Sequence, residues 1–275
     1  MFQLTDHEKF FEANRDLWDK FARINYESET YRVREFLDGA SSLNSIELEE
    51  VGEVRGKTLL HLQCHFGLDT LSWAREGAIV TGVDFSGEAV QLARNLTDEI
   101  GLEARFIQSN IYDLPDVLDE KFDIVFTSYG IHCWLNDLPR WGEIVAHFVK
   151  PGGNFYIAEF HPLLWIFDWD ATDDFKMVRS YFHSSTPCKF DVDGSYADDG
   201  TKIEIQTDYE WTHSMADVVN AIIKSGLQME FLHEFAKAPF QSFPFLKQAD
   251  EGYWIYDNPE VQLPLVYSIK ARKDK

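Results

Sequence analysis

The chain has 275 residues, of which 45% are apolar and 15% aromatic, so it can bury a large core as one large domain or as a domain with an added element. Its formal net charge is −22 and no basic stripe offsets it, so neither a nucleic acid nor an anionic membrane is expected as a partner. The acidity is compatible with a cationic ligand, although a solubilising surface charge is the simpler interpretation.

The cysteine content and the N-terminal segment favour a cytoplasmic protein. Cys64, Cys133 and Cys188 are too few for a disulfide framework, which fits a reducing compartment. Residues 1–20 are polar and mixed in charge, unlike a signal peptide. No apolar run reaches the roughly 20 residues that a helix needs to span a bilayer.

The first 50 residues predict a helical N-terminal cap (residues 1–50). Phe10, Phe11, Leu17, Trp18 and Phe21 recur at helical spacing and predict a helix over 6–23. A short helix is predicted over 43–51. The long helix either packs on the core or closes as a lid over a ligand, since a segment before the first strand is well placed to cover the ligand crevice of an open sheet.

Residues 51–160 predict an α/β core in which strands alternate with helices. The turn at 150–153, Lys-Pro-Gly-Gly, separates the last helix from the last strand. This alternation is typical of a doubly wound, mostly parallel sheet. The predicted strands are 59–62, 79–83, 104–108, 122–128 and 154–159, and the predicted helices are 68–76, 86–100 and 136–149.

The alternation stops at residue 161. Segment 161–212 is rich in aromatic residues and Asp, with two strand-like runs at 189–192 and 203–209, and predicts an inserted antiparallel β flap. Segment 213–275 completes the core with a helix that begins at Ser214 and with strands at 228–235 and 264–272.

The stretch from Lys57 to Asp84 is the centre of the predicted site. It contains an apolar strand, a turn, a helix and a second apolar strand that ends in Asp84, which together predict one βαβ unit. Such a unit binds a nucleotide over its first turn, and an acid about 20 residues further on accepts the ribose hydroxyls.

Residues 60–70, Leu-His-Leu-Gln-Cys-His-Phe-Gly-Leu-Asp-Thr, and the Lys-Pro-Gly-Gly turn resemble the class I S-adenosylmethionine (SAM)-dependent methyltransferases. Residues 60–70 are also similar to the first motif of a bacterial subgroup of that family. The resemblance covers about 55–160 and 213–273. It implies a seven-stranded sheet whose last strand runs antiparallel, with SAM as the cofactor.

The first motif departs from the usual acid-x-Gly-x-Gly-x-Gly pattern of that family. His61, Gln63, His65 and Gly67 occupy its positions, so only the last glycine is present. Glycines let backbone N–H groups approach a pyrophosphate, and SAM has no phosphate. The departure therefore speaks against NAD or FAD more than against SAM.

The resemblance also implies the residues that hold SAM. The turn contacts the methionine part, Asp84 accepts the ribose hydroxyls, Phe85 offers adenine an apolar wall, and Asn110 reaches the adenine amino group. The residues expected to bind the cofactor are Gln63, His65, Gly67, Asp84, Phe85, Asn110, Ile111, Ser128 and Tyr129.

Candidate catalytic side chains follow the fourth and fifth predicted strands, whose carboxyl ends should lie nearest the methyl group. Tyr129, His132 and His161 can orient or deprotonate an acceptor, or can simply pack at the rim. Segment 127–134 lacks the Asn/Asp-Pro-Pro-Tyr and Pro-Cys motifs, which speaks against methylation of a nucleobase amine or of cytosine C5.

Aromatic residues are the candidates for acceptor binding. They can line a pocket for a flat or cationic acceptor, or form the core of their own segments. The residues expected there are Trp18, Tyr31, Trp134, Trp165 and Tyr209. No metal site is expected, because His61, Cys64 and His65 lie on one tight turn without a second ligand pair.

Together these observations predict a SAM-dependent methyltransferase that acts on a small-molecule acceptor. Two alternatives remain open: a non-catalytic SAM-binding or regulatory protein, and an NAD(P)-dependent oxidoreductase. The sequence names neither the acceptor nor the methylated atom, and it does not indicate the oligomeric state.

Overall fold

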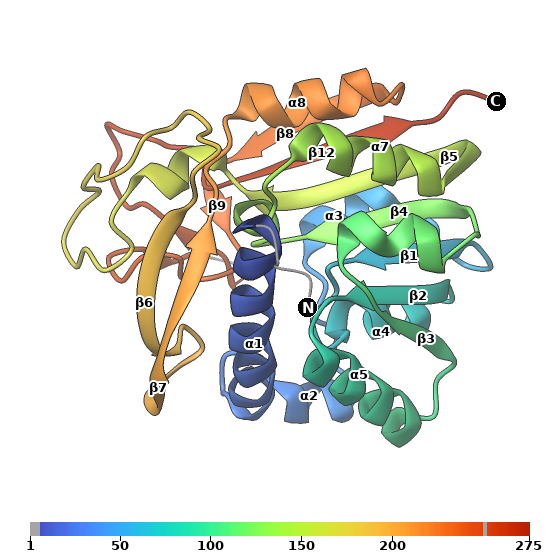
Figure 1. Ribbon diagram of the computed structural model, residues 1–275, viewed down its shortest axis with the longest axis horizontal. Helices are drawn as coiled ribbons and strands as arrows, with labels where there is room; N and C mark the ends of the chain where they lie inside the picture. Colours follow the sequence, from blue (N-terminus) through green and yellow to red (C-terminus); the bar gives the residue numbers. More distant parts are fainter. Residues whose placement is uncertain (1–5, 250–251) are drawn as a thin grey trace.

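A computed structural model describes residues 6–249 and 252–275 of the chain (Figure 1). Its central sheet has seven strands in the order β3-β2-β1-β4-β5-β12-β8. β12 pairs antiparallel with both of its neighbours, and the other pairs are parallel. The predicted α/β fold is therefore confirmed. The strands are β1 Thr58–Leu62, β2 Ile79–Asp84, β3 Ala104–Gln108, β4 Phe122–Ser128, β5 Val149–Phe160, β8 Gln228–Phe235 and β12 Val266–Arg272.

Helices cover both faces of this sheet. Successive side chains of an inner strand point to opposite faces, and both sets are buried. In β1, Leu60 belongs to the apolar cluster under α7 and α8, whereas Leu59 belongs to the cluster with Trp73 of α4. The helices are α2 Val33–Leu37, α3 Ser45–Val51, α4 Leu68–Arg75, α5 Gly87–Ile100, α6 Leu114–Val117, α7 Leu138–Phe148 and α8 Met215–Lys224. Three 3₁₀ turns span Ile111–Asp113, His132–Trp134 and Pro162–Ile166.

The N-terminal helix α1 (Asp6–Glu27) is longer than predicted and lies between the flap and the core (Figure 1). The Asn14 side chain donates to the backbone oxygen of Tyr209 and accepts from its N–H, at 2.8 and 2.9 Å. At the other side of the helix, Asp19 accepts from Ser86 Oγ and from the Glu88 N–H at the start of α5. Helix α1 is thus joined to both the flap and the core.

The flap is the two-stranded hairpin of β6 (Cys188–Ser195) and β7 (Asp198–Glu210). Both strands are longer than predicted, because the Asp193-Gly194 sequence lies within β6 instead of forming the turn. Ser195 pairs with Asp198, so the chain reverses at Tyr196 and Ala197.

The sequence predicted no element between residues 236 and 263, but three short strands there form a small sheet: β9 (Lys237–Ala238), β11 (Trp254–Ile255) and β10 (Lys247–Gln248). Apolar side chains from this region join those of the segment after β5 in one buried cluster, which includes Leu164, Phe167 and Phe243. Two segments far apart in the sequence therefore build one structure beside the carboxyl ends of the strands.

Candidate functional site

The turn after β1 keeps the backbone of a glycine-rich turn with only one glycine. The φ angles are 56° at Gln63, 52° at His65 and 83° at Gly67. Positive φ costs a residue with a Cβ atom roughly 1–2 kcal/mol. Gln63 and His65 therefore hold a strained conformation, and such strain persists where the surrounding structure requires it, often at a binding site.

Glycine is required at Gly67 and Gly82 for a further reason. A Cβ atom at either position would lie 2.6–2.7 Å from the ring of Phe106, closer than real Cβ contacts. The turn and the middle of β2 therefore pack directly against β3. This packing fixes where the turn lies relative to the end of β2.

Asp84 ends β2 and holds the turn in place. Its Oδ2 accepts the His65 N–H at 2.8 Å, and its Oδ1 accepts the Ser86 N–H at 2.9 Å. Burial raises the pKa of Asp84 to about 6, and the two N–H donors oppose this rise. Each carboxylate oxygen has a second lone pair, so the group can also accept ribose hydroxyls.

Three buried polar atoms of the turn and of α1 lack a hydrogen-bond partner within the described part of the chain. They are Gln63 Oε1, His65 Nε2 and Trp18 Nε1. The rings of Trp18 and His65 lie 5.3 Å apart. A buried polar atom without a partner is unfavourable, so these atoms fit a ligand that supplies hydrogen bonds, as the amino-acid part of SAM would.

The loop after β4 is held by the buried carboxylate of Glu159. Glu159 accepts the backbone N–H groups of Gly130 and Ile131 at 2.5 and 2.6 Å. Burial raises its pKa to about 7, against the effect of these donors. Tyr129, directly before this loop, has a φ of 32°. Glu159 therefore fixes the segment expected to lie nearest the methyl group.

Ser128 and Tyr129 are each hydrogen-bonded to the carboxylate of a helix residue. The Ser128 hydroxyl donates to Asp69, and the Tyr129 hydroxyl donates to Glu47, each at 3.0 Å. Burial raises the pKa of Glu47 to about 7 and the pKa of Tyr129 well above its usual value. Sequence reasoning missed Glu47 and Asp69. The Asn44-x-x-Glu47 spacing of a capping box was the available signal for Glu47.

The two candidate histidines are buried in different surroundings. His132 shares a hydrogen bond with the hydroxyl of Tyr267 at 3.0 Å, and burial lowers its pKa well below the usual value. His161 accepts the Leu163 N–H through Nδ1 and donates through Nε2 to Glu234 at 2.9 Å. Burial lowers the pKa of His161, and Glu234 opposes this. The hydrogen bonds recorded for the two histidines do not reach the turn at 63–67.

The residues expected around adenine lie on the loops after β2 and β3. Phe85 is half-buried and Ile111 is 7% exposed. The side-chain oxygen Oδ1 of Asn110 accepts the Tyr112 N–H at 3.0 Å and so caps the start of a 3₁₀ turn. This turn does not use the amide nitrogen of Asn110 or the second lone pair of its side-chain oxygen. Both can therefore form hydrogen bonds with adenine.

Three of the predicted acceptor-binding aromatics gather around the turn, and two do not. Trp18 lies 5.3 Å from Trp134, and Tyr31 lies 5.3 Å from His65, as ring-centroid distances. Tyr196 of the flap, which sequence reasoning missed, joins them through a hydrogen bond to the Tyr31 hydroxyl. By contrast, Trp165 lies 5.0 Å from Trp169, and Tyr209 lies 4.5 Å from Phe10.

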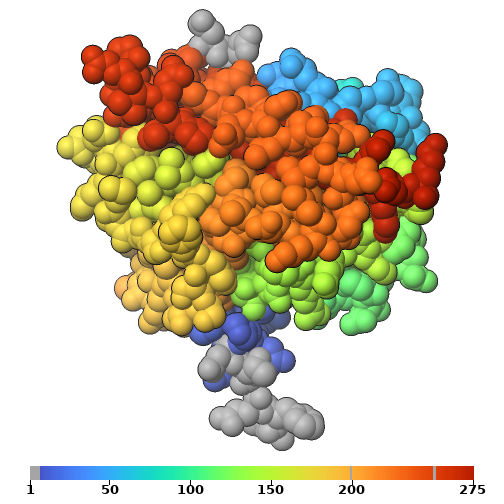
Figure 2. Space-filling view, turned by 90° about the horizontal axis from the view of Figure 1, so that it is seen from above, coloured from blue at the N-terminus to red at the C-terminus, as the bar shows by residue number. Residues whose placement is uncertain are grey.

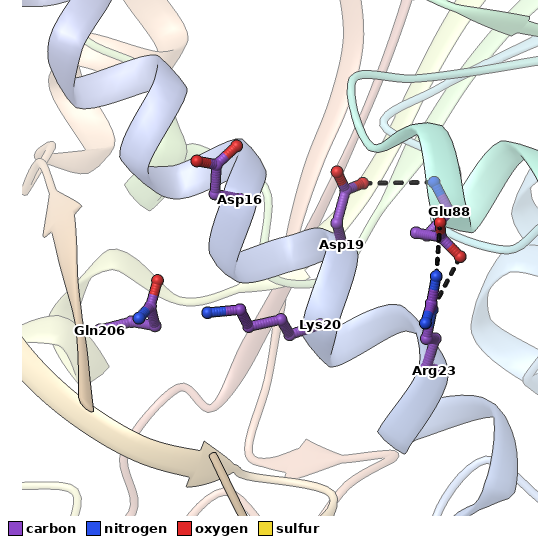
Figure 3. A pocket seen from close by; sticks show the side chains of 6 residues that line it. All are labelled: Asp16, Asp19, Lys20, Arg23, Glu88 and Gln206. Carbon is purple, nitrogen blue, oxygen red and sulfur yellow. Dashed lines mark hydrogen bonds and ion pairs between the residues drawn. The ribbon is translucent and has the colours of Figure 1, made fainter. Parts of the chain in front are cut away.

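A cavity of about 390 Å³ opens between α1, α5 and β7 (Figure 3). The residues that line it are all charged or polar, and the dashed contacts in the figure join Asp19 and Arg23 of α1 to Glu88 of α5. Ligand pockets are mostly apolar, so this opening does not suit adenine. The lining residues are Asp16, Asp19, Lys20, Arg23, Glu88 and Gln206.

Comparison with known proteins adds a family likeness over part of the chain. Residues 59–153 match the family described as "Methyltransferase domain". A ubiquinone biosynthesis O-methyltransferase from Serratia proteamaculans is 32% identical over 114 residues, which are 40% of this chain and 46% of that protein. The chain thus spans about half the length of the curated relatives that it matches.

Two solved structures share the fold over most of both chains. A putative SAM-dependent methyltransferase from Listeria monocytogenes aligns with a TM-score of 0.58 at 20% identity, over 84% of this chain and 97% of its own. A SAM-dependent methyltransferase from Mesorhizobium loti aligns with a TM-score of 0.55 at 21% identity, over 86% and 100%. These likenesses show the fold.

Among the described residues, no helix is both long and apolar enough to cross a membrane.

Proposed function

We propose that the protein is a SAM-dependent methyltransferase that acts on a small molecule. The observation that carries this proposal is the turn after β1, which keeps a glycine-like backbone at Gln63 and His65 and is bonded to Asp84. The unpartnered polar atoms of this turn and of Trp18 support a polar ligand there. The match of residues 59–153 to a methyltransferase domain supports the same assignment.

We assign each part of the donor to residues of this chain. The turn at Gln63, His65 and Gly67 would hold the methionine part, and Asp84 would accept the ribose hydroxyls. Phe85, Asn110 and Ile111 would enclose adenine. When bound, SAM supplies the electrophilic methyl group, and Ser128 and Tyr129 would lie beside it. The order of these groups follows the carboxyl ends of β1, β2, β3 and β4.

The chain's own contribution to the reaction would be to position the two reactants and to exclude water. Helix α1 is tied to the flap through Asn14 and to α5 through Asp19, so the site has a cover on this side. An enclosed site favours a small acceptor over a protein or an RNA.

His132 keeps a neutral imidazole, and its Nε2 has no hydrogen-bond partner among the described residues. We rank it above His161 as a general base, because both nitrogens of His161 are engaged.

Calorimetry with SAM, its demethylated product S-adenosylhomocysteine and NAD tests the donor. We expect both SAM and the product to bind, and NAD not to bind. Transfer of a labelled methyl group from SAM to a pool of metabolites below about 1 kDa then tests the reaction. Tight SAM binding without transfer would favour a non-catalytic SAM-binding protein. Binding of NAD but not SAM would favour an oxidoreductase and defeat the proposal.

A further inference from the structure

Two acids of the flap point inward and are short of partners. Asp208 and Glu210 lie on the same face of β7, since side chains of a strand alternate. Tyr209 between them packs against Phe10 of α1 instead. Asp208 is 5% exposed, and its Oδ1 has no hydrogen-bond partner among the described residues. A buried carboxylate oxygen without a partner is costly, so its presence calls for a reason.

The cation beside these acids does not neutralise both of them. The Nη1 atom of Arg179 lies 3.9 Å from Glu210 Oε2, which is beyond hydrogen-bond distance. Its guanidinium lies over the ring of Phe190, 4.5 Å from the ring centre. Burial raises the pKa of Asp208 to about 6 and the pKa of Glu210 to about 8, and Arg179 opposes both shifts only in part. Two carboxyl groups therefore share one guanidinium.

The strand that carries these acids ends at the loop after β4. The Trp211 N–H, directly after β7, donates to the Cys133 oxygen at 2.8 Å and joins the flap to this loop. Burial raises the pKa of the Cys133 thiol, and Glu210, Glu159 and Asp208 each add to the rise by electrostatic repulsion. Glu210 therefore directly precedes a residue that is bonded to this loop, a few residues after Ser128 and Tyr129.

We propose that Asp208 and Glu210 form a binding site for the protonated amine of the methyl acceptor. This proposal rests on the proposed function and names the acceptor class as a small organic amine. An ammonium group has three N–H donors and one positive charge, which would satisfy the free Asp208 oxygen and balance the second carboxylate. A metal ion fits less well, because no group of three His, Cys, Asp or Glu side chains among the described residues is arranged to hold one.

The amine would serve as a handle for recognition. A nitrogen held as ammonium has no free lone pair, so it cannot attack the methyl group in that state. The methylated atom is therefore another nucleophile of the same molecule. Charge-assisted hydrogen bonds contribute about 1.5–3 kcal/mol, so removal of the amine should weaken binding at least about tenfold.

Matched probe pairs test this site in the 275-residue chain loaded with S-adenosylhomocysteine. The pairs are tyramine and 4-ethylphenol, dopamine and 4-ethylcatechol, and tryptamine and 3-ethylindole, each titrated by calorimetry. We expect the amine to bind at least about tenfold more tightly in one pair or more. Asp208→Asn and Glu210→Gln should each reduce that preference below about twofold while S-adenosylhomocysteine binding is unchanged. Asp193→Asn, an exposed acid of the same hairpin, is the control that keeps the preference.

A second measurement separates binding from a structural role. Without amine at pH 8, Asp208→Asn should raise the melting temperature, because it removes a buried charge that Arg179 balances only in part. A carboxylate with a purely structural role would lower the melting temperature when it is replaced. The proposal is overturned if no amine is preferred in any pair, or if the preference survives in both variants. Loss of S-adenosylhomocysteine binding with an intact amine preference would instead defeat the donor assignment and leave the amine site standing.

Discussion

Gln63 and His65 show how single residues define the candidate site. Both adopt positive φ in a turn where the resembled family has glycine, and the Cys64 N–H between them donates to the Val83 oxygen at 2.9 Å. The turn is thus fixed by its bonds to β2 and to Asp84, and Gln63 Oε1 and His65 Nε2 are left without a hydrogen-bond partner among the described residues. The backbone is retained because these bonds outweigh a strain of roughly 1–2 kcal/mol per residue.

Replacement of Gln63 tests this strain directly. Both Gln63→Ala and Gln63→Gly remove the side chain, but only glycine relieves the positive φ. We expect the glycine variant to have an unfolding free energy about 1 kcal/mol above that of the alanine variant. At an unstrained position the order is reversed, since glycine loses more backbone entropy on folding. Urea denaturation of the two variants measures the difference, and an alanine variant of equal or higher stability would show that the position is not strained.

Asp84 should make SAM binding depend on pH. Its pKa is raised to about 6, so the carboxyl group becomes protonated as the pH falls through that value. Protonation removes lone pairs that the ribose hydroxyls need, so we expect SAM affinity to fall between pH 7 and pH 5. The Asp84→Asn variant should bind more weakly at pH 7, with a flatter pH profile over the same range. Calorimetry at three pH values checks both, and a wild-type affinity that rises toward pH 5 would exclude the role.

At the scale of elements, a side chain of helix α1 takes the place of a neighbouring strand at the edge of β7 that does not pair with β6. Asn14 is 1% exposed and binds both backbone groups of Tyr209, as another strand would. This contact covers the open edge of the hairpin, whose unpaired groups would otherwise invite pairing with other chains. It also connects the predicted cap to the predicted flap.

Asn14→Ala should therefore destabilise the protein. It leaves the N–H and C=O of Tyr209 buried without partners, and each such group costs about 1–3 kcal/mol. We expect a loss of about 3 kcal/mol in chemical denaturation, whereas Glu12→Ala on the exposed side of α1 should change stability by less than about 0.5 kcal/mol. Asn14→Asp retains the acceptor but not the donor and adds a buried charge, so it should not rescue stability. Similar stabilities for Asn14→Ala and Glu12→Ala would contradict the bridging role.

For the whole molecule, a net charge of −22 is combined with carboxyl groups that are buried inside the fold. Burial raises the pKa values of Glu47 and Glu159 to about 7 and that of Glu210 to about 8. Figure 2 shows the face of the molecule on which α8 lies, with part of the flap beside it. Glu47 and Glu159 are fully buried, so they titrate inside the folded protein.

The buried acids should make stability fall as the pH rises from 7 to 8.5. In the unfolded chain a Glu side chain titrates near 4.3, so it is already ionised in this window, while folded Glu47, Glu159 and Glu210 lose protons. The folded state thus holds more protons, and a raised pH removes stability, by up to about 1.4 kcal/mol per pH unit for each group that is still protonated. The buried histidines oppose this slope only near pH 7, where an unfolded imidazole with a pKa near 6.5 is still partly protonated while the folded ones are neutral, and their effect fades as the pH rises.

Urea denaturation at pH 7.0, 7.75 and 8.5 measures this slope. We expect the unfolding free energy to decrease across the series, and we expect Glu47→Gln to have a smaller slope than the wild type, whatever its absolute stability. A flat or rising profile in the wild type would contradict the raised pKa values.

The elements that the sequence predicted correctly are those defined by local patterns. The strands of the core were visible because a strand buried on both faces forms an apolar run. Ser86, Ser214 and Gly101 marked helix ends because capping is a contact among neighbouring residues. The small sheet of β9, β10 and β11 was not predicted, since two-residue strands have no periodicity.

By itself the sequence determined the doubly wound sheet, the place of the turn after β1 and the position of Asp84, because each follows from spacing within one βαβ unit. Only the tertiary structure decided which side chains surround that turn. Trp18 meets His65 and Trp134, and Asn14 meets Tyr209 across 195 residues of sequence. It likewise brought Trp211, directly after Glu210, to the backbone oxygen of Cys133. Such contacts depend on how separately formed elements pack, and no local pattern encodes that.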